Sequence, residues 1–146
     1  MIVLYTSPGC ASCRKVRNWL KENDFKFIEK NIFTTQLQEN EIKYLLLRSE
    51  NGSEDIISKR SKVVINSKIE IDEMKVEELV HFVINNPTVL KRPIIVSENN
   101  FLVGYDVEEI EVLNKYKRKI QRIMEGVDSC DSLLEFDSNK LTEIRT

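Results

Sequence analysis

The segment YTSPGCASC, residues 5–13, decides the fold of this chain, because it sets two cysteines between two regular patterns. Residues 1–5 are nearly all apolar and rich in β-forming residues, which predicts a short buried strand. The residues between this strand and Cys10 have the composition of a tight turn. After Cys13, apolar residues recur at helical spacing as far as Asn23, which predicts a helix.

This order of strand, tight loop, C-x-x-C motif and helix is typical of thioredoxin-like folds. A cysteine that opens a helix faces unpaired backbone N–H groups and the positive end of the helix dipole, so its thiolate is stabilised. Arg14, Lys15 and Arg17 add positive charge nearby. We therefore expect a redox pair with a depressed pKa at Cys10, the more exposed thiol, which attacks first, while Cys13 resolves.

Two other interpretations of the motif stay open at this point. The cysteines could form half of a zinc site, and His81 and Cys130 are the remaining residues of the usual ligand types for it. They could also be two unlinked structural thiols. The position of the motif between a strand and a helix favours the redox pair over both, and we expect no metal and no other cofactor.

Composition places the chain among ordinary globular proteins. Its 146 residues are 41% hydrophobic and 32% charged, enough for one domain with a real core. We see no secretory leader and no apolar run of about 20 residues, so we expect a cytoplasmic protein that does not enter the membrane. In that compartment a disulfide is more often functional than structural. The net charge of −2 predicts no independent strong binding to nucleic acid.

The rest of the chain predicts further strands and helices in an α/β order. Period-two and helical patterns indicate a strand over 25–32, a helix over 39–48, one or two short helical turns within 54–68, a helix over 76–86, a hairpin over 91–104 and a helix from 107 to about 125. Asp106 precedes that last helix as its N-cap. The expected fold is a four-stranded mixed sheet flanked by helices.

The chain changes character after the last helix. We divide it into a thioredoxin-like domain over 1–125 and a polar C-terminal extension over 126–146, which is expected to be a mobile or loosely docked tail. Cys130 lies in this tail and is expected to be free, although a pairing with Cys10 or Cys13 stays open. A cluster of basic residues in the last helix is interpreted as a solvated face; it comprises Lys115, Lys117, Arg118, Lys119 and Arg122.

A series of short motifs resembles the Spx regulators, members of the arsenate reductase-like (ArsC) branch of the thioredoxin-fold superfamily in low-GC Gram-positive bacteria. The likeness runs collinearly from Met1 to about Leu113. The residues that carry it are Tyr5-Thr6-Ser7-Pro8-Gly9-Cys10-Ala11-Ser12-Cys13-Arg14-Lys15, Glu41-Ile42-Lys43, Asn51-Gly52, Ile56-Ile57-Ser58, Arg60-Ser61-Lys62, Arg92-Pro93-Ile94-Ile95 and Val103-Gly104-Tyr105.

This resemblance implies a transcriptional regulator rather than a catalyst. Spx proteins bind the C-terminal domain of the RNA polymerase α subunit and redirect transcription under thiol-oxidative stress. Oxidation of the motif that matches Cys10 and Cys13 tunes that activity. The glycine matching Gly52 lies at the polymerase contact, and arginines matching Arg60 and Arg92 are linked to anion contacts and to the response to oxidation.

The competing structural role for Gly52 is a plain helix C-cap, in which a glycine ends the helix over 39–48. Under the regulator interpretation, we expect Gly52 to be exposed at the end of that helix with a positive φ. We also expect a cis bond between Arg92 and Pro93, as is typical before the corresponding strand of thioredoxin-like folds, and a position for Pro93 close to Cys10.

The chain departs from the family at its tail. Spx proteins end in small apolar residues that a ClpXP-type protease reads, whereas this chain ends Glu143-Ile144-Arg145-Thr146, which puts regulated degradation by that route in doubt.

The rival from another class is an arsenate reductase-like enzyme with Cys10 as nucleophile and with Arg60 and Arg92 holding an oxyanion. No arginine is present near Gly104-Tyr105-Asp106, where such enzymes place a third, and their His-Asn-Pro lead-in is replaced by Thr6-Ser7-Pro8.

Overall fold

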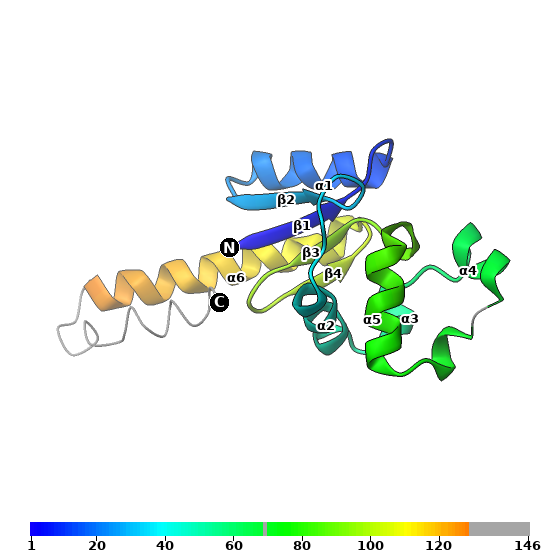
Figure 1. The fold of residues 1–146 in the computed structure, drawn as a ribbon. Coiled ribbons are helices and arrows are strands. Elements are labelled where there is room, and N and C mark those ends of the chain that lie inside the picture. Colours follow the sequence, from blue (N-terminus) through cyan, green and yellow to red (C-terminus); the bar gives the residue numbers. More distant parts are fainter. Residues whose placement is uncertain (69, 129–146) are drawn as a thin grey trace.

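A four-stranded sheet forms the centre of the molecule in the computed structural model, which describes residues 1–68 and 70–128 (Figure 1). Its strands are β1 (Ile2–Thr6), β2 (Phe27–Asn31), β3 (Ile94–Val96) and β4 (Phe101–Val103), in the order β2-β1-β3-β4. β1 and β2 are parallel, and the β1–β3 and β3–β4 pairs are antiparallel. The expected mixed sheet with flanking helices is confirmed.

The helices also follow the predicted order. They are α1 (Ala11–Glu22), α2 (Glu39–Arg48), α3 (Ser53–Ile56), α4 (Lys62–Ser67), α5 (Val76–Asn85) and α6 (Val107–Asp128), with short 3-10 turns at Ile71–Glu73 and Pro87–Val89. One or two short helical turns were expected within 54–68, and the structure has two, α3 and α4, of which α3 begins one residue earlier. α6 continues through Gly126 to Asp128, past the predicted end near Glu125. Residues 129–146, including Cys130, lie outside the described residues.

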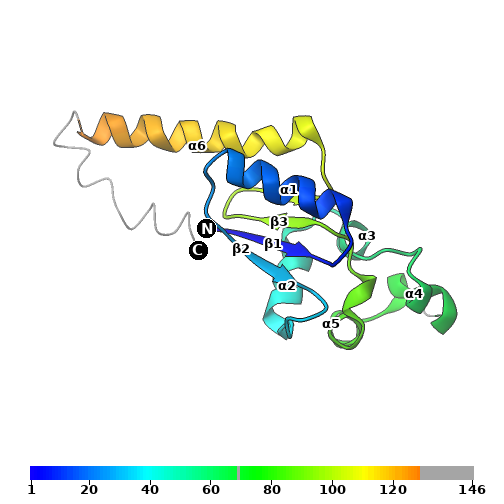
Figure 2. The same ribbon diagram turned by 90° about the horizontal axis from the view of Figure 1, so that it is seen from above.

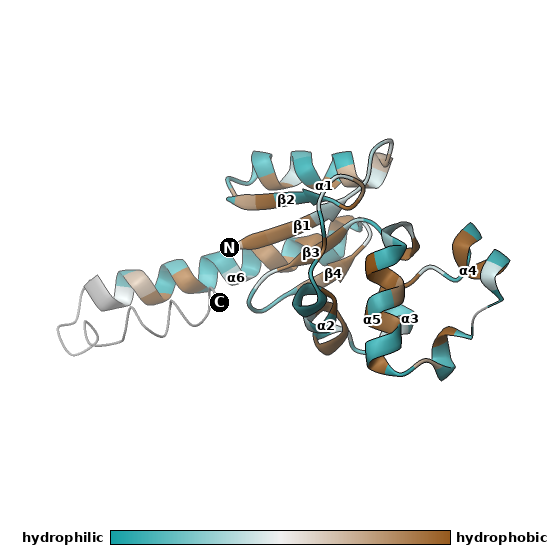
Figure 3. Ribbon diagram, viewed as in Figure 1, coloured by the Kyte–Doolittle hydropathy of each residue, from teal (hydrophilic) through white to brown (hydrophobic). Residues whose placement is uncertain are grey.

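The sheet separates two hydrophobic cores because successive side chains of a strand point to opposite faces. On one face, Ile2 and Leu4 of β1 pack with α1 and α6. On the other face, Tyr5 of β1 and Ile94 of β3 join a larger core with residues of α2, α3, α4 and α5. Figure 2 shows α1 and α6 on one side of the sheet and α2 and α5 on the other. The central strands β1 and β3 are mostly brown in Figure 3, as strands covered on both faces should be, whereas the edge strand β2 is partly teal.

Asp106 caps the start of α6, as its sequence position predicts. Its Oδ1 accepts hydrogen bonds of 2.9 Å from the backbone N–H groups of both Glu108 and Glu109. These bonds satisfy two of the donors that a helix leaves unpaired in its first turn. The cap therefore fixes where the chain leaves β4 and begins to cross the sheet.

Replacing this cap gives a direct test of its contribution. We expect Asp106→Ala to lower the free energy of unfolding by about 1 kcal/mol, since the two donors lose their acceptor. Lys115→Ala, an exposed change on the same helix, should stay within about 0.5 kcal/mol of the parent. Urea denaturation followed by circular dichroism measures both values, and equal effects of the two substitutions would contradict the capping role.

The C-terminal part of α6 runs past the sheet (Figures 1 and 2). Ile110 and Leu113, near its start, are buried under the sheet. After Leu113 no residue of the helix is buried as far as Gly126, the last one whose side-chain environment is described. Across the described residues, we find no helix with the length and apolar character needed to span a bilayer.

Candidate functional site

The loop after β1 brings Cys10 to the N-terminus of α1. Gly9 adopts a φ of 71°, a left-handed conformation that glycine takes without steric strain, and this turns the chain into the helix. Cys10 is the N-cap, and its Sγ accepts a hydrogen bond of 3.1 Å from the backbone N–H of Cys13. The sulfur of one cysteine therefore contacts the backbone of the other, as the C-x-x-C spacing predicts.

The two thiols differ in their surroundings. Cys10 is half-buried, whereas Cys13 is 1% exposed and packs into the core. Burial, followed by the hydrogen bond with Cys10, raises the pKa of Cys13 to about 12, while a backbone hydrogen bond from Ser7 and the charge of Arg92 act in the opposite direction. At neutral pH Cys13 is therefore a thiol, and the expected order of exposure, with Cys10 as the accessible sulfur, is confirmed.

This difference predicts how Cys13 reacts as the pH changes. A pKa near 12 leaves on the order of one thiolate in 10,000 at pH 8, against roughly a quarter for an ordinary cysteine. In a Cys10→Ser, Cys130→Ser protein the contribution of Cys10 to this pKa is removed and that of burial remains, so we expect iodoacetamide to modify Cys13 at least about tenfold more slowly at pH 8 than free cysteine. The rate should still be rising at pH 10. Mass spectrometry measures the extent of modification. A modification rate that stops rising below pH 9 would contradict the raised pKa of Cys13.

Cys10 opens onto a cleft of about 860 Å³ that also holds both arginines singled out in the sequence. Arg60 comes from the loop before α4, and Arg92 precedes β3, so residues distant in the chain meet at one place. Lys59 and Lys91 also line the cleft, and Glu54 contributes a carboxylate to the lining. Sequence reasoning singled out Arg60 and Arg92 but did not place these two lysines at the site.

Arg92 is held by its own contacts. Its Nη1 donates to the backbone oxygen of Thr88 at 3.3 Å, and its guanidinium lies 5.9 Å from the centroid of the Phe33 ring. The bond between Arg92 and Pro93 is cis, which confirms that expectation. Pro93 is buried at the start of β3, and its backbone oxygen accepts from the N–H of Gly104, which itself lines the cleft beside Cys10.

A cluster of polar side chains that sequence reasoning missed lies beside α1. Arg17 of α1 donates to both carboxylate oxygens of Glu29 on β2, at 2.6 Å from Nε and 2.6 Å from Nη2. The hydroxyl of Thr6, which is 1% exposed, donates to the same carboxylate at 2.9 Å. The paired guanidinium lowers the pKa of Glu29. This group ties α1, β1 and β2 together near the cysteine loop.

Gly52 does not end α2, so its interpretation as a C-cap is wrong. α2 ends at Arg48, and the hydroxyl of the next residue, Ser49, donates to the Leu46 oxygen at 2.6 Å, so no left-handed residue is needed there. Gly52 is instead the N-cap of α3, with φ 69° and ψ −133°. The positive φ is confirmed, but the residue is half-buried rather than exposed.

Gly52 lies in an apolar groove of about 570 Å³, separate from the cysteine cleft. Two of the large apolar side chains in the groove are well exposed, with Leu47 at 83% and Val76 at 59%. We call this the Gly52 groove; its lining residues are Lys43, Leu46, Leu47, Gly52, Ser53, Ile71, Asp72, Met74, Val76 and Leu79. The candidate residues therefore divide between a cationic thiol cleft and an apolar groove.

The metal interpretation gains no support from side-chain geometry. Within residues 1–68 and 70–128, no three His, Cys, Asp or Glu side chains gather so that they could hold a metal ion. His81 is exposed on α5, with Nε2 3.8 Å from a Glu39 oxygen. Cys130 is outside the described residues.

Sequence comparison relates this site to known proteins. The family model described as "ArsC family" matches residues 5–113. The chain is 44% identical over 110 residues to the global transcriptional regulator Spx of Enterococcus faecalis, covering 75% of this chain and 83% of that protein. It is 44% identical to the Spx of Bacillus subtilis, covering 75% and 84%, and 46% identical to Spx 1 of Oceanobacillus iheyensis with the same coverage.

Solved structures show the same fold. The crystal structure of a putative ArsC family related protein from Bacteroides fragilis superposes with a TM-score of 0.66 at 26% identity, covering 77% of this chain and 96% of that one. A possible arsenate reductase from Streptococcus mutans gives a TM-score of 0.64 at 18% identity, covering 76% and 98%. At that identity the second likeness bears on the fold alone.

Proposed function

The chain belongs to the ArsC family and, within it, to the Spx group of transcriptional regulators, and from this premise we propose that it is a redox-responsive regulator of transcription. In the proposal, the chain acts in the cytoplasm by binding the C-terminal domain of the RNA polymerase α subunit. A disulfide between Cys10 and Cys13 adjusts this activity under thiol-oxidative stress. The observation that carries the redox part is the hydrogen bond between the two cysteines at the N-terminus of α1.

The proposed switch is a two-electron oxidation of the cysteine pair. With hydrogen peroxide, the Cys10 thiolate attacks one oxygen and forms a sulfenic acid, and the other oxygen leaves as hydroxide, which takes a proton from solvent to give water. The Cys13 sulfur then displaces the sulfenic oxygen as a second water and forms the disulfide. The position of Cys13 suits the second step, because this buried sulfur needs to react only with its neighbour, and its proton leaves with the sulfenic oxygen as water.

Arg60 and Arg92 are proposed to respond to this change. In the reduced state their charges face the cleft onto which Cys10 opens. Oxidation turns the ionisable thiol of Cys10 into a neutral disulfide, so the electrostatic environment of both guanidinium groups changes. Arg92 is the better placed of the two, since its charge already acts on Cys13, where it offsets a small part of the rise in pKa that burial causes.

The Gly52 groove supports the proposed contact with the polymerase. The cores of protein interfaces are typically apolar, and exposed apolar side chains such as Leu47 and Val76 mark them. Gly52 has open space where a side chain would project, with no atom within 4 Å of the position that a Cβ would take. A partner could therefore approach the backbone closely at this point.

A thiol-dependent arsenate reductase is the second candidate, because Cys10 shares a cationic cleft with Arg60 and Arg92. Gly104 lines the same cleft near the position where the third arginine of such enzymes is expected, and it has no side chain to offer. We therefore favour the regulator. An arsenate reduction assay with glutaredoxin or thioredoxin separates the two, and turnover that is lost in Cys10→Ser would support the enzyme instead.

A pull-down with the purified C-terminal domain of the polymerase α subunit as bait tests the regulator directly. The expected result is retention of the reduced chain by the bait and not by the empty resin. Retention in the absence of arsenate turnover would support the regulator against the enzyme. A chain that turns over arsenate and does not bind the bait would overturn the proposal.

A further inference from the structure

The ion pair between Arg17 and Glu29 lies beside the redox helix α1, and the proposed function gives it no role. Glu29 is paired with Leu4 in the parallel register of β1 and β2, and Leu4 packs in the core beneath α1. Thr6 lies two residues beyond Leu4 on β1, so its side chain faces the same side of the sheet. The carboxylate of Glu29 is therefore presented to α1 at the end of the sheet where the cysteine loop begins.

Arg17 shares one face of α1 with the two cysteines. It follows Cys13 by four residues and Cys10 by seven, so it lies about 6 Å and about 10 Å further along the helix axis. Helix side chains lean toward the N-terminus, which directs Arg17 toward the turn that holds Cys13. The pKa of Arg17 is raised mainly by the hydrogen bond with Glu29 and in smaller part by the charges of both thiols. The guanidinium and the two sulfurs therefore influence one another.

Glu29 places the opposite charge at the same position. Its carboxylate lies 2.6 Å from both Nε and Nη2 of Arg17, and the hydrogen bonds to Arg17 lower its pKa, so it is ionised at neutral pH. A positive and a negative charge this close together largely cancel at a distance of one or two helical turns. The sequence suggests that Arg17 adds to the positive charge around Cys10, and the structure shows that Glu29 offsets it.

The carboxylate is held at the strand end that also positions Cys13. The hydroxyl of Thr6, which is 1% exposed, donates to Glu29 at 2.9 Å. The next residue, Ser7, donates a backbone hydrogen bond to the Cys13 sulfur. One short segment of β1 therefore fixes the negative charge and the buried thiol relative to each other.

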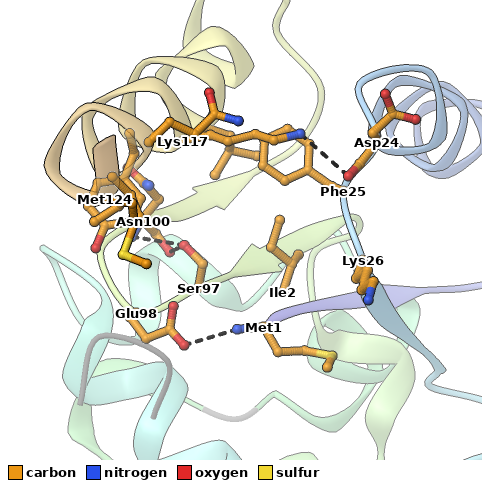
Figure 4. Close-up of a pocket in the computed structure, with 14 residues that line it drawn as sticks. Met1, Ile2, Asp24, Phe25, Lys26, Ser97, Glu98, Asn100, Lys117 and Met124 are labelled. Carbon is orange, nitrogen blue, oxygen red and sulfur yellow. Dashed lines mark hydrogen bonds and ion pairs between the residues drawn. The ribbon is translucent and has the colours of Figure 1, made fainter. Parts of the chain in front are cut away.

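α1 is also anchored independently of this ion pair. At its C-terminal end, Nζ of Lys117 donates to the backbone oxygens of Asn23 at 2.9 Å and of Asp24 at 3.4 Å. Figure 4 shows Lys117 extending from α6 toward Asp24, beside a cavity of about 410 Å³ at the far end of the sheet from Cys10. Val16 and Leu20 of α1 are fully buried in the core. Loss of the ion pair should therefore change the charge beside the thiols more than the position of the helix.

We propose, on the basis of the redox switch proposed above, that Glu29 acts through Arg17 to make the disulfide between Cys10 and Cys13 harder to reduce. Reduction breaks the sulfur–sulfur bond, and the two sulfurs take up two electrons and two protons to become thiols, the more acidic of which can then lose its proton. A positive charge nearby stabilises that thiolate and with it the reduced state. Because Glu29 cancels the charge of Arg17, it removes this stabilisation and favours the disulfide.

Equilibration with glutathione tests this charge balance in the full chain, with Cys130→Ser in every protein. Two molecules of glutathione become glutathione disulfide and supply the two electrons and two protons. Glu29→Gln keeps the shape of the side chain and an acceptor for Thr6, but it leaves the charge of Arg17 uncancelled. At pH 9, where an ordinary cysteine is largely ionised, we expect it to raise the equilibrium constant for reduction of the protein disulfide at least about threefold.

The reverse change and the double change separate charge from structure. Arg17→Gln leaves the carboxylate uncancelled and should lower the same equilibrium constant at least about twofold at pH 9. The double variant, with both substitutions, carries neither charge and should lie within about 1.5-fold of the parent. A purely structural role would instead shift all three variants in one direction.

The pH dependence gives a second distinction. All the differences should shrink at pH 6, where fewer thiols are ionised, whereas the effect of a displaced helix would persist at both pH values. The charged residues of the cysteine cleft, together with Arg14, Lys15 and Lys21 of α1, are the same in all four proteins, so their contributions cancel in the comparison.

Equal constants in the four proteins, or shifts of one sign in both single variants, would overturn this inference and leave the switch in place. If the parent forms no disulfide between Cys10 and Cys13, the switch itself fails. The rate at which iodoacetamide modifies Cys10 at pH 6 in a Cys13→Ser, Cys130→Ser background then decides the inference. A faster rate with Glu29→Gln and a slower rate with Arg17→Gln would support the role of Glu29, and equal rates would overturn it.

Discussion

Mild oxidation of the reduced protein is expected to link Cys10 to Cys13 within one chain. The two residues already contact each other, with Cys10 Sγ 3.1 Å from the backbone nitrogen of Cys13, and the cleft leaves Cys10 accessible to peroxide or diamide. Thiol trapping and peptide mass spectrometry should find a loss of two hydrogen atoms in the peptide that holds both cysteines. Dithiothreitol should reverse it completely.

Three serine variants show which thiols take part. Cys10→Ser and Cys13→Ser should each abolish the link, and Cys130→Ser should leave its yield unchanged. The two single variants should also differ in the oxidation product that accumulates. Cys13→Ser should accumulate a sulfenic acid at Cys10, because the accessible thiol still reacts and no partner resolves it. A link that passes through Cys130 instead, or one that survives both single changes, would show that the switch has been assigned to the wrong residues.

The second large effect is expected at the Gly52 groove, where Gly52→Arg should remove binding to the C-terminal domain of the α subunit. The backbone conformation at Gly52 is nearly restricted to glycine, so substitution costs about 1–3 kcal/mol in the free protein. This strain is small against a total stability of roughly 5–15 kcal/mol. The arginine side chain projects into open space, and it should block the partner without unfolding the chain.

Two further variants separate blocking of the partner from strain. Gly52→Ala forces a residue with a side chain into the same backbone conformation, so its free energy of unfolding should match that of Gly52→Arg. Because the alanine side chain is small, this variant should retain most of the binding. Leu47→Asp changes a side chain that is 83% exposed, so it should leave stability within about 0.5 kcal/mol of the parent. It should weaken binding at least about tenfold, a loss typical of a residue at an interface core. If Leu47→Asp binds like the parent, the Gly52 groove is not the interface.

Local patterns were sufficient to predict most of the fold. The apolar run of β1 and the helical period after Cys13 each specify one element, because the spacing of apolar residues reflects which side of the element is buried. The position of Asp106 likewise predicts the start of α6, since an N-cap depends only on adjacent backbone groups. These features depend on interactions between residues close together in the chain.

Features that depend on contacts distant in sequence were harder to predict. Glu29 interrupts the apolar alternation of its strand, and only the parallel pairing of β1 with β2 shows that it accepts from Arg17 and Thr6. Gly52 follows a helix and therefore suggests a C-cap, but Ser49 satisfies the end of α2 first. The meeting of Arg60 and Arg92 with Cys10 was anticipated only through family resemblance, because the folding of α3, α4 and β3 brings them together.

The central claim is that this chain is a transcriptional regulator that contacts polymerase through the Gly52 groove. Calorimetric titration of the reduced chain with the purified C-terminal domain of the α subunit tests it most directly, with Gly52→Arg as the matched control. We expect saturable binding of one domain per chain by the parent and no measurable heat with Gly52→Arg. No binding by the parent, or equal affinity in the two proteins, would contradict it.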